Sequence, residues 1–168
     1  MEVSLGEPIE PSLAAVRDLP ANAKFRTGGV TADVFPDPRQ LARAILACAR
    51  SAVPFKATAG LHHPLRAEYR LTYALDSASG TMFGYLNVLL AAALAWRASG
   101  EDMVAALLDE RDPAAFALGD DVLRWRDQTF GMDEMREVRT RFMHGFGSCS
   151  FREPMDEFMG NSGHGMHA

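Results

Sequence analysis

Two segments of the sequence, FRTGG at residues 25–29 and FKATAG at residues 55–60, repeat one pattern at an interval of about 30 residues, the length of one βα unit in an eight-unit barrel. When Phe25-Arg26 is aligned with Phe55-Lys56, strand alternation points both phenylalanines to one face of a sheet and both cations to the other. We therefore predict two similar strands that bury phenylalanine against helices and end in glycine turns.

The first half of the chain alternates short strand patterns with single helical patterns. We predict strands at residues 2–5 and 53–59, a strand that runs into a turn at residues 23–29, and helices at residues 11–19 and 38–52. The second helix has the clearest signals, because Asp37 is a suitable cap and Pro38 suits its first position. Strands that alternate with single helices are parallel neighbours joined by right-handed crossovers. The sequence therefore predicts an α/β fold with three parallel strands in βα units that resemble part of a TIM-type barrel.

From residue 79 onward the pattern is helical. We predict a helix that begins at Ser79 or Thr81 and runs to residue 98, further helices at residues 101–110, 120–127 and 133–142, and a short one after Pro154. The predicted organisation is a single α/β domain over residues 1–160, with βα units (1–78) and a helical part (79–160), followed by a flexible tail (161–168). Three strands cannot close a barrel, which needs about eight. We expect either a small open sheet covered by helices, or part of a barrel that a missing N-terminal portion or a partner chain completes.

Charge and hydropathy exclude several classes of protein. The net charge is −5 with a sequence pI of about 5.5, and the basic residues are scattered, unlike those of nucleic-acid-binding proteins. The longest apolar run, at residues 82–96, is shorter than the ~20 residues that cross a bilayer, and the N terminus has no secretory signal. Cys48 lies on an apolar helix face, whereas Cys149 is either a packing residue or a reactive loop thiol. We expect a reduced, cytoplasmic protein that binds neither nucleic acid nor membrane.

Ligands of parallel sheets bind at the carboxyl ends of the strands, where both repeated segments place their unusual residues. Lys56 is the candidate nucleophile or electrostatic centre, and His62 or His63 is the candidate for proton transfer. The cations, hydroxyls and turn amides around them are suited to holding a carboxylate or a phosphate. The candidate substrate-binding residues are Lys24, Arg26, Thr27, Gly28, Gly29, Thr58, Gly60 and Arg66.

Structural roles compete with these assignments. The cations have acidic neighbours in Asp33, Asp37 and Glu68, and ion pairs with them would leave no ligand site. The two adjacent histidines point apart in an extended loop, and the sequence has no HxH, HExxH or CxxC spacing. A metal site would need His144 or Glu68 as an additional ligand. We therefore predict neither a metal nor another cofactor.

The motifs FRTGGVTADVFP, PFKATAGLHHPLR, YLNVLLAAAL and FGSCSFREP resemble those of a family of conserved bacterial proteins of unassigned function, over about residues 23–153. That family includes longer members, which fits the small number of predicted strands. The KATAG segment at residues 56–60 is also similar to the strand-end Lys-x-Ser/Thr-x-Gly of barrel aldolases of the deoxyribose-phosphate aldolase type, in which the lysine forms a Schiff base. Those enzymes carry a second lysine before a Ser-Gly-Gly turn, where this chain has Arg26, with Lys24 two residues earlier, and their two strands occur in the opposite order. The resemblance implies Schiff-base chemistry at Lys56 by analogy.

These features lead to one functional hypothesis and its alternatives. The leading hypothesis is a lyase-like or aldolase-like enzyme that acts on a small anionic, carbonyl-bearing metabolite, with Lys56 at its centre. The first alternative is a non-catalytic part-barrel that binds a partner chain or a second copy of itself as a homo-oligomer, or an anion-binding module. The second is a metal-dependent hydrolase built around His62, His63 and His144.

Overall fold

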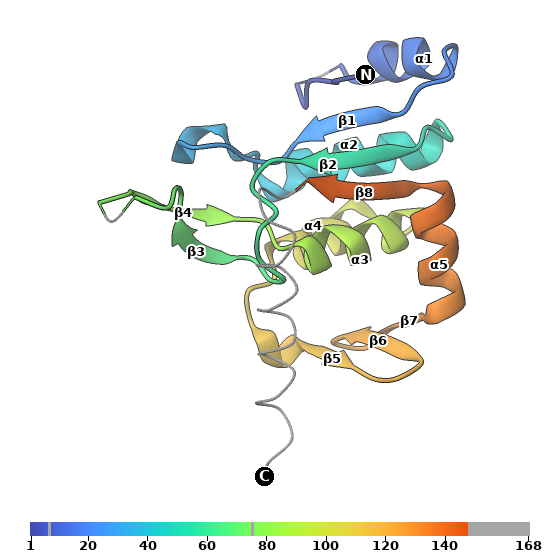
Figure 1. The fold of residues 1–168 in the computed structure, drawn as a ribbon. Helices are drawn as coiled ribbons and strands as arrows, with labels where there is room; N and C mark the ends of the chain where they lie inside the picture. The colour runs from blue at the N-terminus through green and yellow to red at the C-terminus, as the bar shows by residue number, and fades with distance from the viewer. Residues whose placement is uncertain (7, 75, 148–168) are drawn as a thin grey trace.

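A parallel sheet forms the centre of the fold (Figure 1). In the computed structural model, which describes residues 1–6, 8–74 and 76–147, the sheet contains β1 (Ala23–Arg26), β2 (Phe55–Thr58) and β8 (Met143–Gly147) in the order β1-β2-β8. A parallel bridge from Glu2 to Lys24 extends the sheet beyond β1. The order of the strands across the sheet is therefore the same as their order in the chain.

The helices follow from this order. Because each step across the sheet is in the same direction, right-handed crossovers place the connecting helices on one face. α2 (Pro38–Arg50) connects β1 to β2, and the long connection from β2 to β8 contains α3 (Tyr85–Trp96), α4 (Glu101–Asp109) and α5 (Met132–Arg141). α1 (Glu10–Arg17) precedes β1.

The main core lies between the sheet and these helices. Phe25 and Phe55 are fully buried with ring centroids 5.6 Å apart, and Phe55 packs edge-on against Phe142 at 5.1 Å. Trp96 of α3 also packs against Phe142, with ring centroids 5.5 Å apart. The predicted alternation is confirmed, because both phenylalanines are buried while Lys56, between Phe55 and Ala57, is exposed.

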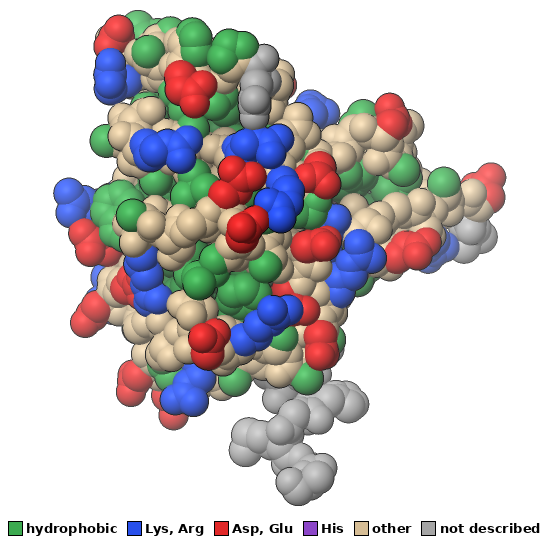
Figure 2. All heavy atoms as spheres, turned by 180° about the vertical axis from the view of Figure 1, so that it is seen from behind, with side chains coloured by type: hydrophobic (Ala, Val, Ile, Leu, Met, Phe, Trp, Pro, Cys, Tyr) green, Lys and Arg blue, Asp and Glu red, His purple; other side chains and the backbone are tan. Residues whose placement is uncertain are grey.

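Ion pairs link the helices on their outer side. Arg39 of α2 pairs with Asp102 of α4 at 2.7 Å, and Arg43 pairs with Glu101 at 3.4 Å. Figure 2 shows positive and negative side chains interspersed on the side of the molecule opposite to that seen in Figure 1. This side therefore offers no large area of one charge.

Two antiparallel elements accompany the central sheet. β3 (Ala67–Arg70) and β4 (Ser79–Met82) form a hairpin that extends from the body beside the 3-10 helix η1 (Ala32–Val34) (Figure 1). After α4 and a second 3-10 helix, η2 (Pro113–Ala115), a three-stranded sheet is formed by β5 (Phe116–Leu118), β6 (Val122–Trp125) and β7 (Gln128–Gly131). Within the described residues, no helix combines the length and apolar character that crossing a membrane requires.

Several predicted elements differ in the structure. The helix predicted at residues 120–127 is wrong: this segment contains β6 and the turn to β7, in which Arg126 has a left-handed φ of 52°. Strand-forming residues such as Val122, Trp125 and Phe130 decide the conformation there. Residues 79–82 form β4 instead of a helix start, residue 2 forms an isolated bridge instead of a strand, and residues 143–147 form the third parallel strand.

The mixed α/β class is therefore correct, whereas a wholly helical second half and a barrel are not confirmed. Cys149, the short helix predicted after Pro154 and the predicted tail at residues 161–168 lie outside the described residues.

Candidate anion-binding face of the parallel sheet

One face of the parallel sheet carries a row of cations. Lys24 of β1 and Lys56 of β2 are register partners, and the next row on the same face pairs Arg26 with Thr58. Neighbouring strands are only about 4.8 Å apart, so the two lysine side chains leave the sheet side by side. We call this surface, formed by Lys24, Arg26, Lys56 and Thr58, the open face.

Among the described residues, one carboxylate pairs with these cations. The carboxylate of Glu2 lies 2.5 Å from Lys24 Nζ. The hydrogen bond from Lys24, together with the lysine's charge, holds the pKa of Glu2 below its usual value. Within the part of the chain that the structure describes, Arg26 and Lys56 are exposed and neither forms an ion pair. Like charges directly opposite on neighbouring strands are destabilising, so the open face is suited to an anion.

β8 provides a surface without side chains beside these cations. Gly145 is the register partner of Lys56, and Gly147 is the partner of Thr58, so backbone alone faces the open side at both positions. Glycine inside a strand often marks a place where a ligand approaches the backbone closely. The register shifts between Phe55 and Lys56, which leaves His144 as an additional residue in β8.

His144 contributes an imidazole to this face. Its Nδ1 lies 3.0 Å from Nδ2 of Asn22, the residue that precedes β1. Asn22 alternates with the buried Ala23, so the imidazole and the lysines lie on the same side of the sheet. His144 was predicted from the sequence only as a possible metal ligand, and no strand was predicted at residues 143–147. The alternation of glycine in HGFG was the available signal for a strand with a bare face.

A cavity of about 540 Å³ opens beside Arg26. Its walls combine apolar side chains with Ser4, Gln40, Glu2 and Asp33. The apolar walls suit the body of a small molecule, and the two carboxylates can accept hydrogen bonds from hydroxyl or amino groups. Arg26 is the residue that belongs to both the cavity and the open face.

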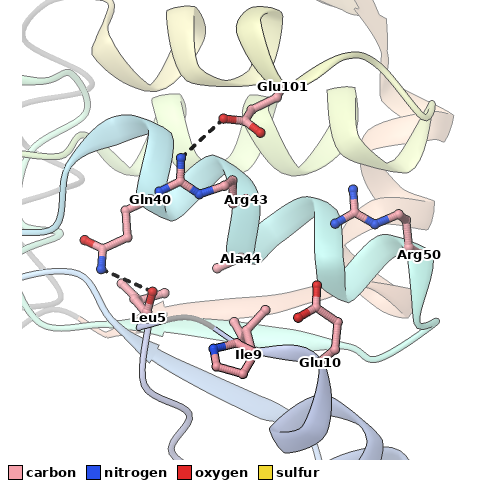
Figure 3. A pocket seen from close by; sticks show the side chains of 9 residues that line it. Leu5, Ile9, Glu10, Gln40, Arg43, Ala44, Arg50 and Glu101 are labelled. Carbon is pink, nitrogen blue, oxygen red and sulfur yellow. Dashed lines mark hydrogen bonds and ion pairs between the residues drawn. The ribbon is translucent and has the colours of Figure 1, made fainter.

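A second cavity, of about 440 Å³, lies between α1, α2 and the N-terminal segment (Figure 3). Gln40 Nε2 donates a hydrogen bond of 3.1 Å to the Leu5 carbonyl, and both residues also line the first cavity. Figure 3 shows Arg43 directed toward Glu101 of α4. Two arginines and two glutamates line this cavity, so its charges balance and do not favour an anion.

The two predicted threonines hold the strand ends together. Thr27 is fully buried, and its Oγ1 donates to the carbonyl oxygens of Ala59 at 2.7 Å and Thr58 at 3.2 Å. Thr58 Oγ1 in turn donates to the Phe25 carbonyl at 3.1 Å. These reciprocal bonds fix the carboxyl ends of β1 and β2 relative to each other, so the hydroxyl protons are already used. A direct contact between either threonine and a ligand stays a prediction.

The predicted glycines accommodate neighbouring side chains. A Cβ atom at Gly28 would lie 2.4 Å from the Phe35 ring, one at Gly60 would lie 2.9 Å from it, and one at Gly29 would lie 2.6 Å from Val34. Gly60 also has a left-handed φ of 75°. Packing therefore accounts for glycine at these positions, and their amides as anion ligands stay a prediction.

The predicted histidine pair lies beside the hairpin. The ring of His63 stacks on Tyr69 with centroids 3.4 Å apart, and the ring of His62 lies 6.4 Å from that of His63. The His63 carbonyl accepts a hydrogen bond from the Tyr85 amide at the start of α3. The contacts seen for His63 therefore connect the loop to β3 and α3, and a catalytic role for either histidine stays a prediction.

Arg66 is buried between α3 and α4. Its guanidinium lies 4.4 Å from the Phe83 ring centroid, and its Nε donates to Asp109 at 3.0 Å. Nη1 is buried, and no residue that the structure describes forms a hydrogen bond with it. Burial lowers the pKa of Arg66, and the charge of Asp109 only partly opposes that shift. The structure thus groups Lys24, Arg26, Lys56 and Thr58 on one face, while Arg66 takes part in helix packing.

Over residues 1–6, 8–74 and 76–147, no three His, Cys, Asp or Glu side chains lie close enough to hold a metal ion. No protein-family model, curated protein or solved structure matches the chain.

Proposed function

We propose that the open face binds a small anionic molecule that bears a carbonyl group, and that Lys56 forms a Schiff base with it. The observation that carries the proposal is the pairing of Lys24 with Lys56. Of the 17 Lys and Arg residues in the chain, two are lysines, and these two are the register partners. Arginine suffices for ion pairs and anion contacts, so lysine at two adjacent positions of an arginine-rich chain favours a role for a primary amine.

Lys56 is the better nucleophile of the two. Lys24 is occupied by its ion pair with Glu2, whereas Lys56 is exposed and has bare backbone beside it at Gly145. The Lys56 amine would attack the carbonyl carbon and, after loss of water, form a C=N bond. The planar guanidinium of Arg26, in the next row, would hold a carboxylate or phosphate of the same molecule.

His144 is a suitable proton-transfer group for this chemistry. His144 belongs to β8, the strand next to β2, which carries Lys56. Its imidazole lies on the same side of the sheet as Lys56, beside the side chain of Asn22. Histidine exchanges protons near neutral pH, as carbinolamine dehydration requires. We therefore favour His144 over His62 and His63 for this role.

We also propose that the sheet is an arc of a barrel-type arrangement. The Glu2 bridge, β1, β2 and β8 cross the sheet in chain order, as consecutive strands do in such barrels. The open face would then correspond to the barrel interior. Further strands from an additional N-terminal portion or from a partner chain would complete it.

Borohydride trapping tests the covalent part of the proposal. The purified protein is mixed with each of a panel of 2-keto acids and keto phosphates, reduced with cyanoborohydride, digested and examined by mass spectrometry. We expect an adduct on Lys56, and none on that residue in the Lys56→Arg variant, which keeps the charge but lacks the amine. Lys24→Arg serves as the matched control and should leave the Lys56 adduct intact. Labelling of neither lysine by any member of the panel would refute the Schiff base.

Anion binding is measured separately, by calorimetry with carboxylates and phosphates that lack a carbonyl group. Arg26→Gln should weaken binding about tenfold, because a charge-assisted hydrogen bond is lost. Arg124→Gln, which removes an exposed cation of β6, should have no effect. Anion binding without an adduct would leave the protein as a non-catalytic anion-binding module. Binding that is equally strong in the Arg26→Gln variant would contradict the proposed site.

A further inference from the structure

The hairpin formed by β3 and β4 has an edge that the described part of the chain leaves unpaired. Within the described residues, β3 pairs with β4 alone, in an antiparallel register that places Tyr69 opposite Gly80. The hairpin extends away from the central sheet (Figure 1). A two-stranded hairpin is only marginally stable by itself, and an uncovered strand edge is a template for another strand.

The register shows which backbone groups point outward. The Leu71 amide donates to the Ala78 carbonyl at 2.9 Å, so Leu71 and Ala78 form a hydrogen-bonded pair. In an antiparallel ladder these pairs alternate with non-bonded ones, so Tyr69 also faces β4. The N–H and C=O groups of Glu68 and Arg70 therefore point to the free edge of β3.

The side chains of these two residues have opposite charges. Glu68 and Arg70 are both exposed and lie on one face of the hairpin, two positions apart. Tyr69 between them points to the other face, where it stacks on His63 and donates its hydroxyl proton to the Leu65 carbonyl at 3.0 Å. The edge is therefore self-complementary under a twofold rotation about Tyr69.

We propose that two copies of this chain associate through antiparallel pairing of their β3 strands, with a twofold axis at Tyr69. Glu68 of each copy then lies opposite the partner's Arg70, and both residues use their outward N–H and C=O groups in the new ladder. The two hairpins become one four-stranded antiparallel sheet. A two-residue shift in either direction would place Glu68 opposite the partner's Glu68, or Arg70 opposite the partner's Arg70, so charge selects the central register.

The size of the edge limits the strength of this contact. A pair of four-residue strands buries much less than the ~800 Å² per partner of a standard interface. The dimer should therefore dissociate on dilution and re-form as the protein is concentrated. Each copy keeps its own open face, so dimer formation and anion binding can be tested independently.

Charge reversal at the edge provides the main test, with sedimentation velocity from micromolar to millimolar protein as the measurement. Glu68→Arg and Arg70→Glu should each raise the dimer dissociation constant at least about tenfold, because attractive pairs become repulsive on both sides of the axis. The double variant Glu68→Arg/Arg70→Glu restores opposite charges and should recover dimerisation. Asp76→Arg changes charge elsewhere in the same hairpin and should have no such effect. A monomer throughout this range, or a double variant as weak as the single ones, would overturn the proposal.

Disulfide trapping tests the register without altering charge. In a Cys149→Ser background, Tyr69→Cys places two thiols directly opposite each other in a non-hydrogen-bonded pair, at a separation that a disulfide can span. Oxidation should give a covalent dimer in this variant. Ala67→Cys is the control, because its two copies would be four positions out of register, roughly 13 Å apart. Efficient cross-linking of Ala67→Cys but not of Tyr69→Cys would reject the register.

Discussion

The backbone amide of Arg66 donates a hydrogen bond of 2.9 Å to the side-chain Oδ1 of Asn87. Asn87 is fully buried, and its Nδ2 donates to the carbonyls of Leu107 and Glu110, each at 2.9 Å. One amide side chain therefore connects the loop after β2, the first turn of α3 and the end of α4. This connection relates the PFKATAGLHHPLR segment to YLNVLLAAAL: residues 63–66, at the end of the first motif, support the start of the helix that the second motif forms.

Replacing Asn87 should strongly destabilise the protein. Asn87→Leu has a similar volume but removes the acceptor of the Arg66 amide and the side-chain donor to the Glu110 carbonyl, whereas the Leu107 carbonyl keeps the Glu110 amide as a partner. We expect a loss of about 3 kcal/mol in the free energy of unfolding, measured by urea denaturation. Thr129→Val, a similar change at an exposed position of β7, should shift stability by less than about 0.5 kcal/mol. Comparable stabilities for the two variants would contradict the role assigned to Asn87.

Three helices offer a matched set of glycine substitutions. Gly84, Gly100 and Gly131 each precede a helix with similar extended dihedral angles. A Cβ atom at Gly84 would lie 2.3 Å from the Pro64 carbonyl oxygen, whereas nothing lies within 4 Å of one at Gly100 or Gly131. Gly84→Ala should therefore destabilise the fold by about 3 kcal/mol or more, as measured by chemical denaturation. Gly100→Ala and Gly131→Ala should each change it by less than about 1 kcal/mol, the usual cost of losing a glycine cap.

Stability should depend on pH through Glu110. Burial opposes ionisation of this carboxyl, but hydrogen bonds from the Asp112 amide, Arg126 and Trp125 outweigh it and lower the pKa of Glu110 from its usual value of 4.5. A lowered folded-state pKa means that the ionised form stabilises the fold above the unfolded-state pKa. That contribution is lost as the pH falls through the folded-state value.

The Glu110→Gln variant tests this dependence. It should lose about 2 kcal/mol of unfolding free energy at pH 7, and the difference from the parent protein should shrink in acid. The matched control is Glu137→Gln, which removes the exposed partner of Arg141 in α5 and should have little effect at any pH. Urea denaturation at several pH values measures both. A difference for Glu110→Gln that grows in acid would have the wrong sign.

Cys48 should be chemically inert in the folded protein. Burial raises the pKa of its thiol to about 12. Relative to the usual thiol pKa of 9.0, the thiolate fraction is reduced roughly a thousandfold. In a Cys149→Ser variant, a disulfide reagent at pH 8 should label no thiol under native conditions and one thiol in denaturant. Rapid labelling of the native variant would show that Cys48 is accessible.

Strand alternation was sufficient to predict the central features of the site. The alternation of Phe25 with Arg26, and of Phe55 with Lys56, defines which side of each strand is buried. The sequence reveals this because the residues of one strand are consecutive in the chain. The pairing of Lys24 with Lys56 did not follow from that pattern, since the register places Lys24 and not Arg26 beside Lys56. A register depends on packing between segments, which a local pattern does not contain.

The position of Arg66 and the strand conformation of residues 143–147 depend on contacts with distant parts of the chain. Arg66 is removed from the site because Phe83 and Asp109, on other elements, surround its guanidinium. Residues 143–147 form a strand because β2 offers them an edge, although Gly145 and Gly147 weaken any strand signal. The wrong helix prediction at residues 120–127 had a cause within the local sequence, because Val122, Trp125 and Phe130 were already consistent with two strands.

The position of β8 has a consequence for biosynthesis. One edge of β2, next to the buried Phe55, is covered only by residues near the end of the described chain, after the hairpin, three helices and the second sheet have been made. A nascent chain leaving the ribosome would therefore expose this unpaired strand edge from the synthesis of β2 until β8 emerges, and the three-stranded sheet could not be completed before then. Ribosome-stalled chains that stop before residue 143 should accordingly recruit chaperones, and those long enough to expose residue 147 outside the exit tunnel should release them.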